Sequence, residues 1–429
     1  MFITQAFKGE NKWWRYILVT ILVFFGYLIG TFPLRMALWR VVDEDPNLNQ
    51  VDVERFFENP DFNEFGINTN LGLTLMLLMF VAALAVLYFV IKPLHNREFN
   101  TIARTSGHVD WNRIFFAFGF WLILGLGFEA IGYLNSPENY TVGFKLNTFL
   151  PLLALSIFIL PIQTSFEEFF FRGYLMQGIG ISTLRNVLIV IGVFIVCYFL
   201  NMALVANLLT DGSSALESLT DRFYYQDGNI DELERDPVAY EEASSKAYAL
   251  VSLCIKMLLV LVFLVLSALM IRLSKPSQNG ERPHNYKIVA LVLSSVLFGL
   301  IHSANPEIEK FGYGIMMVYY ISAGMLLGIV TLMDNRIELA LGIHAATNFT
   351  GAVFVGYDGA AIQTDSILTS HSLNPYLMTG GFFVLAGVFL FFAKRKYGWG
   401  SFSQLLDPIY KPDEDQDLGH LLVDLDQNQ

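Results

Sequence analysis

Apolar stretches long enough to cross a lipid bilayer recur along almost the whole chain, and they constrain the fold more than any other feature. Hydrophobic residues make up 54% of the 429 positions and charged residues only 15%, whereas soluble domains have about 25% charged residues. Because backbone polar groups inside a bilayer must be satisfied internally, uncharged stretches of about 20 residues predict transmembrane helices. We therefore expect an all-α, polytopic transmembrane helical bundle.

The apolar stretches number ten, and the connections between them alternate in charge. The predicted spans cover about residues 15–33, 70–92, 113–134, 150–178, 186–209, 248–272, 287–304, 312–332, 338–357 and 374–393. Basic residues gather in the N-terminus and after the second, sixth and tenth spans, whereas the connections after the first and fifth spans are acidic. By the positive-inside rule, both termini are expected in the cytoplasm. The expected location is the cell membrane, plasma or inner, with multiple passes.

Two acids and a base stand inside the fourth span, in the sequence Glu167-Glu168-Phe-Phe-Phe-Arg172. A charge at bilayer depth costs about 2.5–3.5 kcal/mol on insertion scales, so this cluster requires partners or a function. On a helix, Glu168 and Arg172 are four residues apart, share a face and are expected to pair. Glu167 is rotated by about 100° from Glu168 and is predicted to lack a partner within the helix. It is therefore the candidate general base.

Two further polar motifs lie in other spans. His302 ends the sequence Phe298-Gly-Leu-Ile-His302 in the seventh span, and the ninth span carries His344-Ala-Ala-Thr-Asn348, whose two polar residues share a helical face. Each motif alone is ambiguous, because an asparagine in a membrane helix often only hydrogen-bonds to a neighbouring helix. Straight, untilted helices would also hold Glu167, His302 and His344 at different depths. Prolines and glycines in these spans permit the breaks or tilts that could bring them together.

Together, the three motifs have the parts to activate water. A carboxylate beside a histidine can deprotonate a water molecule, while a second histidine and an amide can stabilise an oxyanion. Glu167, His302 and His344 could instead hold a Zn²⁺ ion with an open position. The spacing is not the His-Glu-x-x-His zinc pattern, so the sequence leaves a zinc cofactor open.

The order of these motifs resembles that of the CPBP family of intramembrane proteases. This family includes the type II CAAX prenyl endopeptidases and bacterial bacteriocin-processing or abortive-infection-like proteins. The resemblance rests on Glu-Glu-x-x-x-Arg, then Phe-x-x-x-His, then His-x-x-x-Asn, and it covers about residues 113–357. It implies an intramembrane endopeptidase, glutamate-dependent or metal-dependent, that cleaves a membrane-associated peptide or protein substrate.

The resemblance also implies a role for each polar residue. Glu167 and His302 would activate the attacking water, and His344 and Asn348 would stabilise the tetrahedral intermediate. Glu168 and Arg172 would order the site. In the family the second motif usually follows the first after a few tens of residues, whereas two apolar spans and an acidic loop separate them here. The ten spans are therefore interpreted as an eight-span family core with an inserted two-span hairpin.

This interpretation divides the chain into four parts and leaves two other functions to consider. The parts are residues 1–112 with spans one and two and an acidic external loop, 113–357 as the protease-like core with the hairpin at about 186–272, 358–396 with the last span, and 397–429 as an acidic, disordered cytoplasmic tail. The net charge of −12, without a basic stripe, argues against a nucleic-acid partner. The alternatives are a non-catalytic immunity or scaffold protein that retains the polar motif, and a proton-coupled transporter.

Overall fold

The computed structural model describes residues 1–45, 60–105, 107–183, 185–192 and 284–412, with short pieces between 46–59 and between 219–265. Contacts divide the chain into two compact units, Met1–Ser182 with Arg282–Gln429, and Thr183–Glu281. Apart from Thr183, the few described residues of the second unit are helical, as at 185–192 and 219–222. Of the predicted span 186–209 the structure describes only 186–192, and of 248–272 only residue 265; the tail beyond 412 lies outside the described residues. The six candidate residues all belong to the first unit.

The described chain is mostly helical, as predicted, and six of its helical stretches are long and apolar enough to cross a membrane. These are α1 (Trp13–Glu44), α3 (Thr69–His95), α4 (Trp111–Asn135), the stretch Leu146–Ile181, α13 (Tyr313–Asp334) and α15 (Pro375–Tyr397). A shorter apolar helix, α11, covers Lys287–Ile301. The ten-span count and the orientation of the termini stay predictions.

Local sequence explains several helix boundaries. Asn68, Asp110 and Asn374 cap the N-termini of α3, α4 and α15, and each side chain accepts two backbone N–H bonds of the first turn. Such caps satisfy donors that have no partner within the helix. At the other end, α3 stops at Asn96, whose positive φ of 50° is a left-handed helix cap. Helix α1 continues to Glu44, well past the predicted end at 33. Pro33 does not end it but lies inside the helix.

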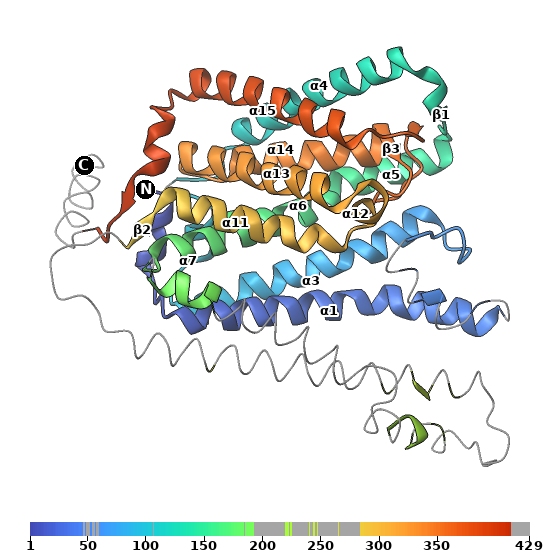
Figure 1. The fold of residues 1–429 in the computed structure, drawn as a ribbon, viewed down its shortest axis with the longest axis horizontal. Coiled ribbons are helices and arrows are strands. Elements are labelled where there is room, and N and C mark those ends of the chain that lie inside the picture. The colour runs from blue at the N-terminus through green and yellow to red at the C-terminus, as the bar shows by residue number, and fades with distance from the viewer. Residues whose placement is uncertain are drawn as a thin grey trace. The chain divides into compact units, whose positions relative to one another are not determined.

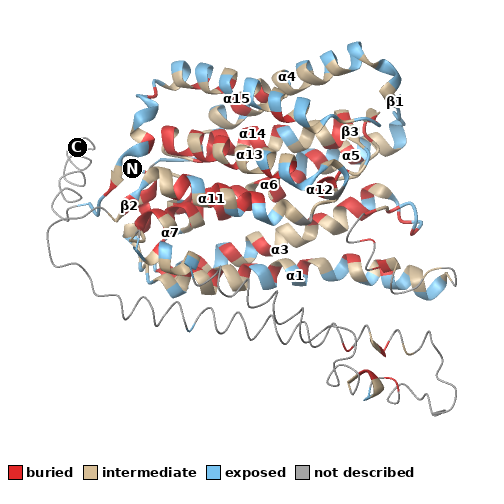
Figure 2. Ribbon diagram, in the orientation of Figure 1, coloured by how far each residue is buried: buried red, intermediate tan, exposed pale blue. Residues whose placement is uncertain are grey.

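Helix α14 (Glu338–Phe349) lies among three other helices and forms the centre of the first unit. It packs against α4, α6 (Leu160–Glu168) and α13, while α11 packs on α13 and on α7 (Met176–Ile181). Helices α1 and α3 form a separate antiparallel pair, and α3 contacts α6 (Figure 1). Buried residues accordingly concentrate on α6, α11 and α14 (Figure 2). A Cβ on Gly342 would lie 2.4 Å from the Ile114 carbonyl oxygen, so this glycine permits the close packing of α14 on α4.

The predicted ninth span, 338–357, is helical only in part. After α14 the chain forms a π-helix, η6 (Thr350–Phe354), and then strand β3 (Val355–Tyr357). The prediction of helix through 357 was therefore wrong for the last three residues. They pair with β4 (Leu368–Ser370), in parallel, and β4 pairs antiparallel with β1 (Tyr140–Val142).

The remaining elements are short. Helix α5 (Leu146–Phe158) precedes α6, and α12 (Pro306–Phe311) connects α11 to α13. Strands β2 (Asn285–Tyr286) and β5 (Pro408–Ile409) form an antiparallel pair. The 3-10 helices are η1 (Ile3–Lys8), η2 (Phe99–Ile102), η3 (Pro137–Asn139), η5 (His302–Ala304) and η7 (Phe402–Leu406).

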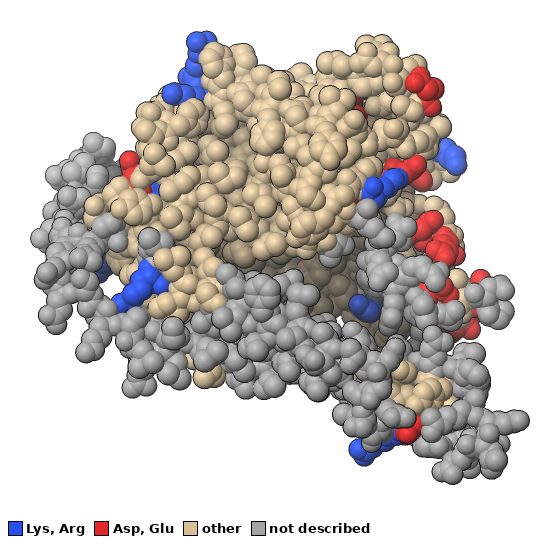
Figure 3. Space-filling view, viewed as in Figure 1, with Lys and Arg blue, Asp and Glu red and all other residues tan. Residues whose placement is uncertain are grey.

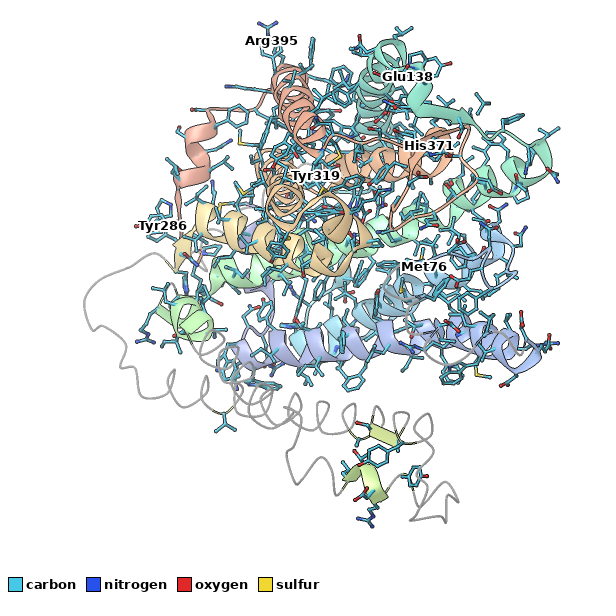
Figure 4. The ribbon with its side chains drawn as sticks, turned by 45° about the vertical axis from the view of Figure 1, so that its right-hand side comes forward. Met76, Glu138, Tyr286, Tyr319, His371 and Arg395 are labelled. Atoms are coloured by element: carbon cyan, nitrogen blue, oxygen red, sulfur yellow. The ribbon has the colours of Figure 1, made fainter. Side chains whose placement is uncertain are left out.

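Charged side chains lie mainly at the two ends of the helical body. Figure 3 shows acidic side chains gathered at its right-hand end and basic ones at the upper and lower left. In Figure 4, Arg395 on α15 and Tyr286 on β2 lie toward one end, and Glu138 and His371 lie toward the other. The face between these ends that Figure 3 shows is largely without charged side chains. Exposed large hydrophobic side chains of the first unit include Ile29, Phe89, Phe115 and Val384.

Candidate active site

The acidic cluster stands where a membrane helix becomes irregular. Helix α5 ends at Phe158, and α6 begins at Leu160 with Pro161 in its first turn. Proline suits this position because its missing N–H has no partner there in any case. Helix α6 ends at Glu168 and continues directly as a π-helix, η4 (Phe169–Leu175), which contains Arg172. Short π-helical segments occur frequently at functional sites.

Glu168 pairs with Arg172, as its spacing predicted. The Arg172 Nη1 donates to Glu168 Oε1 at 3.0 Å, and both side chains are fully buried. Arg172 also lies 4.1 Å from the centre of the Phe298 ring and donates through Nη2 to the Gly324 carbonyl at 3.4 Å. Glu168 therefore has a buried cation that stabilises its charged form.

The same Glu168 oxygen also binds His344 on α14. The Nδ1 atom of His344 lies 2.8 Å from Glu168 Oε1. Because a charged carboxylate can only accept, we assign the hydrogen to Nδ1, which leaves Nε2 with a free lone pair in the neutral ring. This contact joins the first and third sequence motifs across the interface between α6 and α14. The sequence left open whether these two motifs meet, and in the structure they do.

Glu167 has a partner that the sequence interpretation missed. Gln163 lies one turn earlier on α6, and its Nε2 donates to Glu167 Oε1 at 2.6 Å. The prediction that Glu167 lacks a partner within its helix is therefore wrong. The spacing of four residues was a signal that could have identified Gln163. Gln163 Oε1 in turn accepts from Asn348 Nδ2 at 2.8 Å, so one amide side chain connects the acid on α6 to the asparagine on α14.

The second oxygens of Glu167 and Glu168 both remain available, and that of Glu167 faces His344. Among the described residues, Glu167 Oε2 has no hydrogen-bond partner, although the side chain is buried. It lies 3.6 Å from His344 Nε2. This distance exceeds that of a direct hydrogen bond, and both atoms carry lone pairs when the acid is charged and the ring is neutral. A water molecule within reach of both atoms could donate to both.

His302 lies close to this group but makes no described contact with Glu167. Its Nδ1 lies 2.7 Å from the Phe298 carbonyl oxygen, which can only accept, so Nδ1 carries the hydrogen and Nε2 is free. The ring stacks on Tyr320 with centroids 4.4 Å apart, a neighbour that the sequence did not suggest. The Phe298 ring contacts both His302 and His344, with centroids at 4.6 and 5.9 Å.

A zinc ion held by Glu167, His302 and His344 stays a prediction of the sequence. Among the described residues, no group of three or more His, Cys, Asp or Glu side chains is placed to hold a metal ion. His344 and His302 direct Nδ1 at an oxygen of Glu168 and of the Phe298 backbone carbonyl, respectively. Zinc-bound histidines also make such contacts through the ring nitrogen that does not bind the metal, so these two contacts do not argue against zinc.

Comparison with known proteins places this site inside a recognised segment. Residues 147–350 match the model of a family described as type II CAAX prenyl endopeptidase Rce1-like. An uncharacterized protein of Bacillus subtilis strain 168, YyaK, is 29% identical over 201 residues, which are 46% of this chain and 64% of the Bacillus protein. The match thus spans less than two thirds of that relative. No solved structure matches the chain. The resemblance predicted from the three motifs is confirmed, and the matched segment contains all six candidate residues.

Proposed function

Because residues 147–350 match the model of the Rce1-like type II CAAX prenyl endopeptidase family, we propose that the chain is an intramembrane endopeptidase in which Glu167 activates the attacking water. The described residues include six helices long and apolar enough to cross a membrane, and together with the family match they support an integral multi-pass membrane protein. At the family level the activity is that of a peptidase. The roles of individual residues, the substrate and the mechanism form the proposal.

The single observation that carries the proposal is the free Oε2 atom of Glu167 opposite His344 Nε2. A water molecule that lies beside these two atoms and donates to both would lose one proton to Glu167 as its oxygen attacks the carbonyl carbon of the scissile bond. The carbonyl π bond breaks, and its electron pair forms the oxyanion. When the C–N bond breaks, the proton held by Glu167 passes to the leaving nitrogen, so the acid is regenerated.

The remaining polar residues would support this reaction. Asn348 donates one amide N–H to Gln163 and has a second N–H for the oxyanion. The His302 ring is held by the hydrogen bond from Nδ1 to the Phe298 carbonyl oxygen, and its Nε2 has no hydrogen-bond partner among the described residues. We assign His302 to water activation together with Glu167. Glu168 holds His344 through its Nδ1, and Arg172 holds Glu168, so we assign both residues to ordering the site.

The proposed substrate is a peptide segment of a membrane-associated protein. The candidate acids lie in a stretch that is long and apolar enough to cross the membrane, so a substrate reaches them from within or beside the bilayer. The family description raises a prenylated substrate as a specific hypothesis to test. Matched peptides with and without a C-terminal prenyl group would separate a prenyl-dependent enzyme from a general membrane peptidase.

The test compares wild-type protein with Glu167→Gln in detergent or in liposomes, using membrane-anchored peptides and detection of the new termini by mass spectrometry. Glutamine keeps an oxygen for the Gln163 hydrogen bond but cannot take a proton, so cleavage should fall by at least about 100-fold. Glu307→Gln is a matched control, because Glu307 is also buried and has one oxygen unpartnered among the described residues. Proteolysis by Glu167→Gln at the wild-type rate would refute the proposal.

A non-catalytic scaffold is the second candidate, and one observation favours it. The hydrogen bonds from Asn348 to Gln163 and from His344 to Glu168 both join α14 to α6. A protein that used the motif only to hold these helices would keep its cellular role in the Glu167→Gln variant, because neither bond involves that acid. An endopeptidase would lose its cellular role together with cleavage.

A further inference from the structure

A small cationic pocket lies near the ends of two helices, away from the acids of the proposed catalytic site. Its volume is about 240 Å³, and its lining includes Lys8, Lys92, Arg97, Glu98 and Thr101. Lys8 ends η1, Lys92 is in the last turn of α3, and Thr101 belongs to η2. The volume is below the roughly 300–1,000 Å³ of pockets for drug-sized molecules, so the pocket suits a compact group.

Arg97 is the residue that requires explanation. Its side chain is only 4% exposed. It donates through Nη1 to Gln177 Oε1 at 2.8 Å, while its Nε and Nη2 atoms have no hydrogen-bond partner among the described residues. A buried guanidinium with unused donors is costly unless an anion or another acceptor reaches it.

The guanidinium is also held in place before any ligand arrives. Gln177 on α7 is fully buried, and its Nε2 donates to the carbonyls of Phe2 and Thr101 at 3.2 and 2.9 Å. These bonds orient the Gln177 oxygen that accepts from Arg97. A planar, fixed guanidinium can bind two oxygens of one phosphate, which a lysine ammonium does not do.

The charges around Arg97 favour an anion. Lys8 and Lys92 are exposed at the same pocket, and the only acid among its described lining residues, Glu98, is paired with Lys92 at 2.8 Å. The C-terminal dipole of α3 accounts for a lysine in its last turn. It does not account for Arg97, which lies beyond the helix and is buried. We propose that this pocket binds a phosphate group, with Arg97 as the main donor and the two lysines as additional cations.

A phospholipid headgroup and a free phosphate ion share this chemistry. The pocket lies where α3, a candidate membrane span, comes to its end, so a headgroup at the bilayer surface is within its reach. The experiment separates the two sources. The full chain in neutral detergent would be titrated with phosphatidylglycerol, with phosphatidylcholine, or with inorganic phosphate, while thermal unfolding is followed.

The main variant is Lys8→Gln with Lys92→Gln, because both residues are exposed and their loss should leave the fold intact. The wild type should gain thermal stability with phosphatidylglycerol, and the double variant should need at least about tenfold more of the lipid for the same shift. Lys12→Gln is the matched control, because Lys12 is an exposed lysine that is not part of the pocket lining. It should respond as the wild type does.

A second variant, Arg97→Gln, tests the central donor and should lose the shift entirely. A shift with inorganic phosphate as well would identify a general phosphate site, and a shift with phosphatidylglycerol alone would identify the headgroup. The proposal is overturned if the wild type responds to none of the three probes. It is equally overturned if phosphatidylglycerol stabilises the wild type no more than phosphatidylcholine does and inorganic phosphate has no effect. It is also overturned if the double variant or Arg97→Gln responds like the wild type.

Discussion

Replacing each of the two adjacent acids by glutamine should have different effects on stability and on peptide cleavage. Glu168 is completely buried and receives hydrogen bonds from Arg172 at 3.0 Å and from His344 at 2.8 Å. In Glu168→Gln the guanidinium of Arg172 stays buried without a counter-charge. Breaking a buried ion pair in this way costs about 3–5 kcal/mol. Glu167 makes no ion pair with a described arginine or lysine, so Glu167→Gln should change the stability by less than about 1 kcal/mol.

A third variant checks the cause of the expected loss. Replacing both partners, as Glu168→Gln with Arg172→Met, removes the unpaired charge and leaves an oxygen that can still accept from His344. The double variant should therefore recover most of the lost stability, to within about 1–2 kcal/mol of the wild type. Some loss should remain, because Arg172 also contacts the Phe298 ring and the Gly324 carbonyl.

The assay is reversible unfolding in mixed micelles, followed by tryptophan fluorescence, with peptide cleavage measured on the same samples. Glu167→Gln should be folded and inactive, whereas Glu168→Gln should be destabilised. Two results would refute this reasoning. One is a Glu168→Gln protein as stable as the wild type. The other is a double variant less stable than Glu168→Gln alone.

Three further predictions concern positioning, packing and pH. Gln163→Ala should lower kcat about 10- to 100-fold with little change in KM, because the base and the oxyanion donor both lose their common partner; an unchanged kcat would show that this bridge is dispensable. Gly342→Ala should destabilise the protein by about 1–3 kcal/mol, since its Cβ would lie 2.4 Å from a backbone oxygen of α4, whereas Gly380→Ala, with open space around it, should not. Burial raises the pKa of Glu307 above its ordinary 4.5. The protonated side chain therefore contributes stability that is fully present below pH 4.5 and is lost as the pH rises through the pKa of the folded protein. The free energy of unfolding, measured against pH, should show no such loss in Glu307→Gln.

The parts of the site that the sequence predicted are those within one helix. Glu168 and Arg172 pair because residues four apart on a helix are neighbours, and that spacing can be read directly from the order of the residues. The same rule applied to Gln163 would have found the hydrogen bond to Glu167. An amide does not stand out among apolar residues as a charge does, so the sequence pattern did not single it out.

Contacts between helices could not be predicted in the same way. The pairing of His344 with Glu168 depends on how closely α14 and α6 pack, and this in turn depends on the positions at which each helix ends. The break before Leu160 and the π-helix after Glu168 redirect the chain on both sides of the two acids. Nothing in the apolar pattern distinguishes such a stretch from a straight span. Strand β3 shows the same limit, because its residues read as the end of a helix.

These irregular segments explain how distant motifs meet inside a membrane. A straight span satisfies all of its backbone bonds internally and offers neighbouring helices only side chains. In this protein α6 changes to a π-helix immediately after Glu168, and α14 changes to one immediately after Phe349. The two helices that carry Glu167, Glu168, His344 and Asn348 thus both continue into a π-helix, and they are joined by hydrogen bonds to Glu168 and to Gln163. The residues proposed to carry the reaction therefore also join the helices that place them.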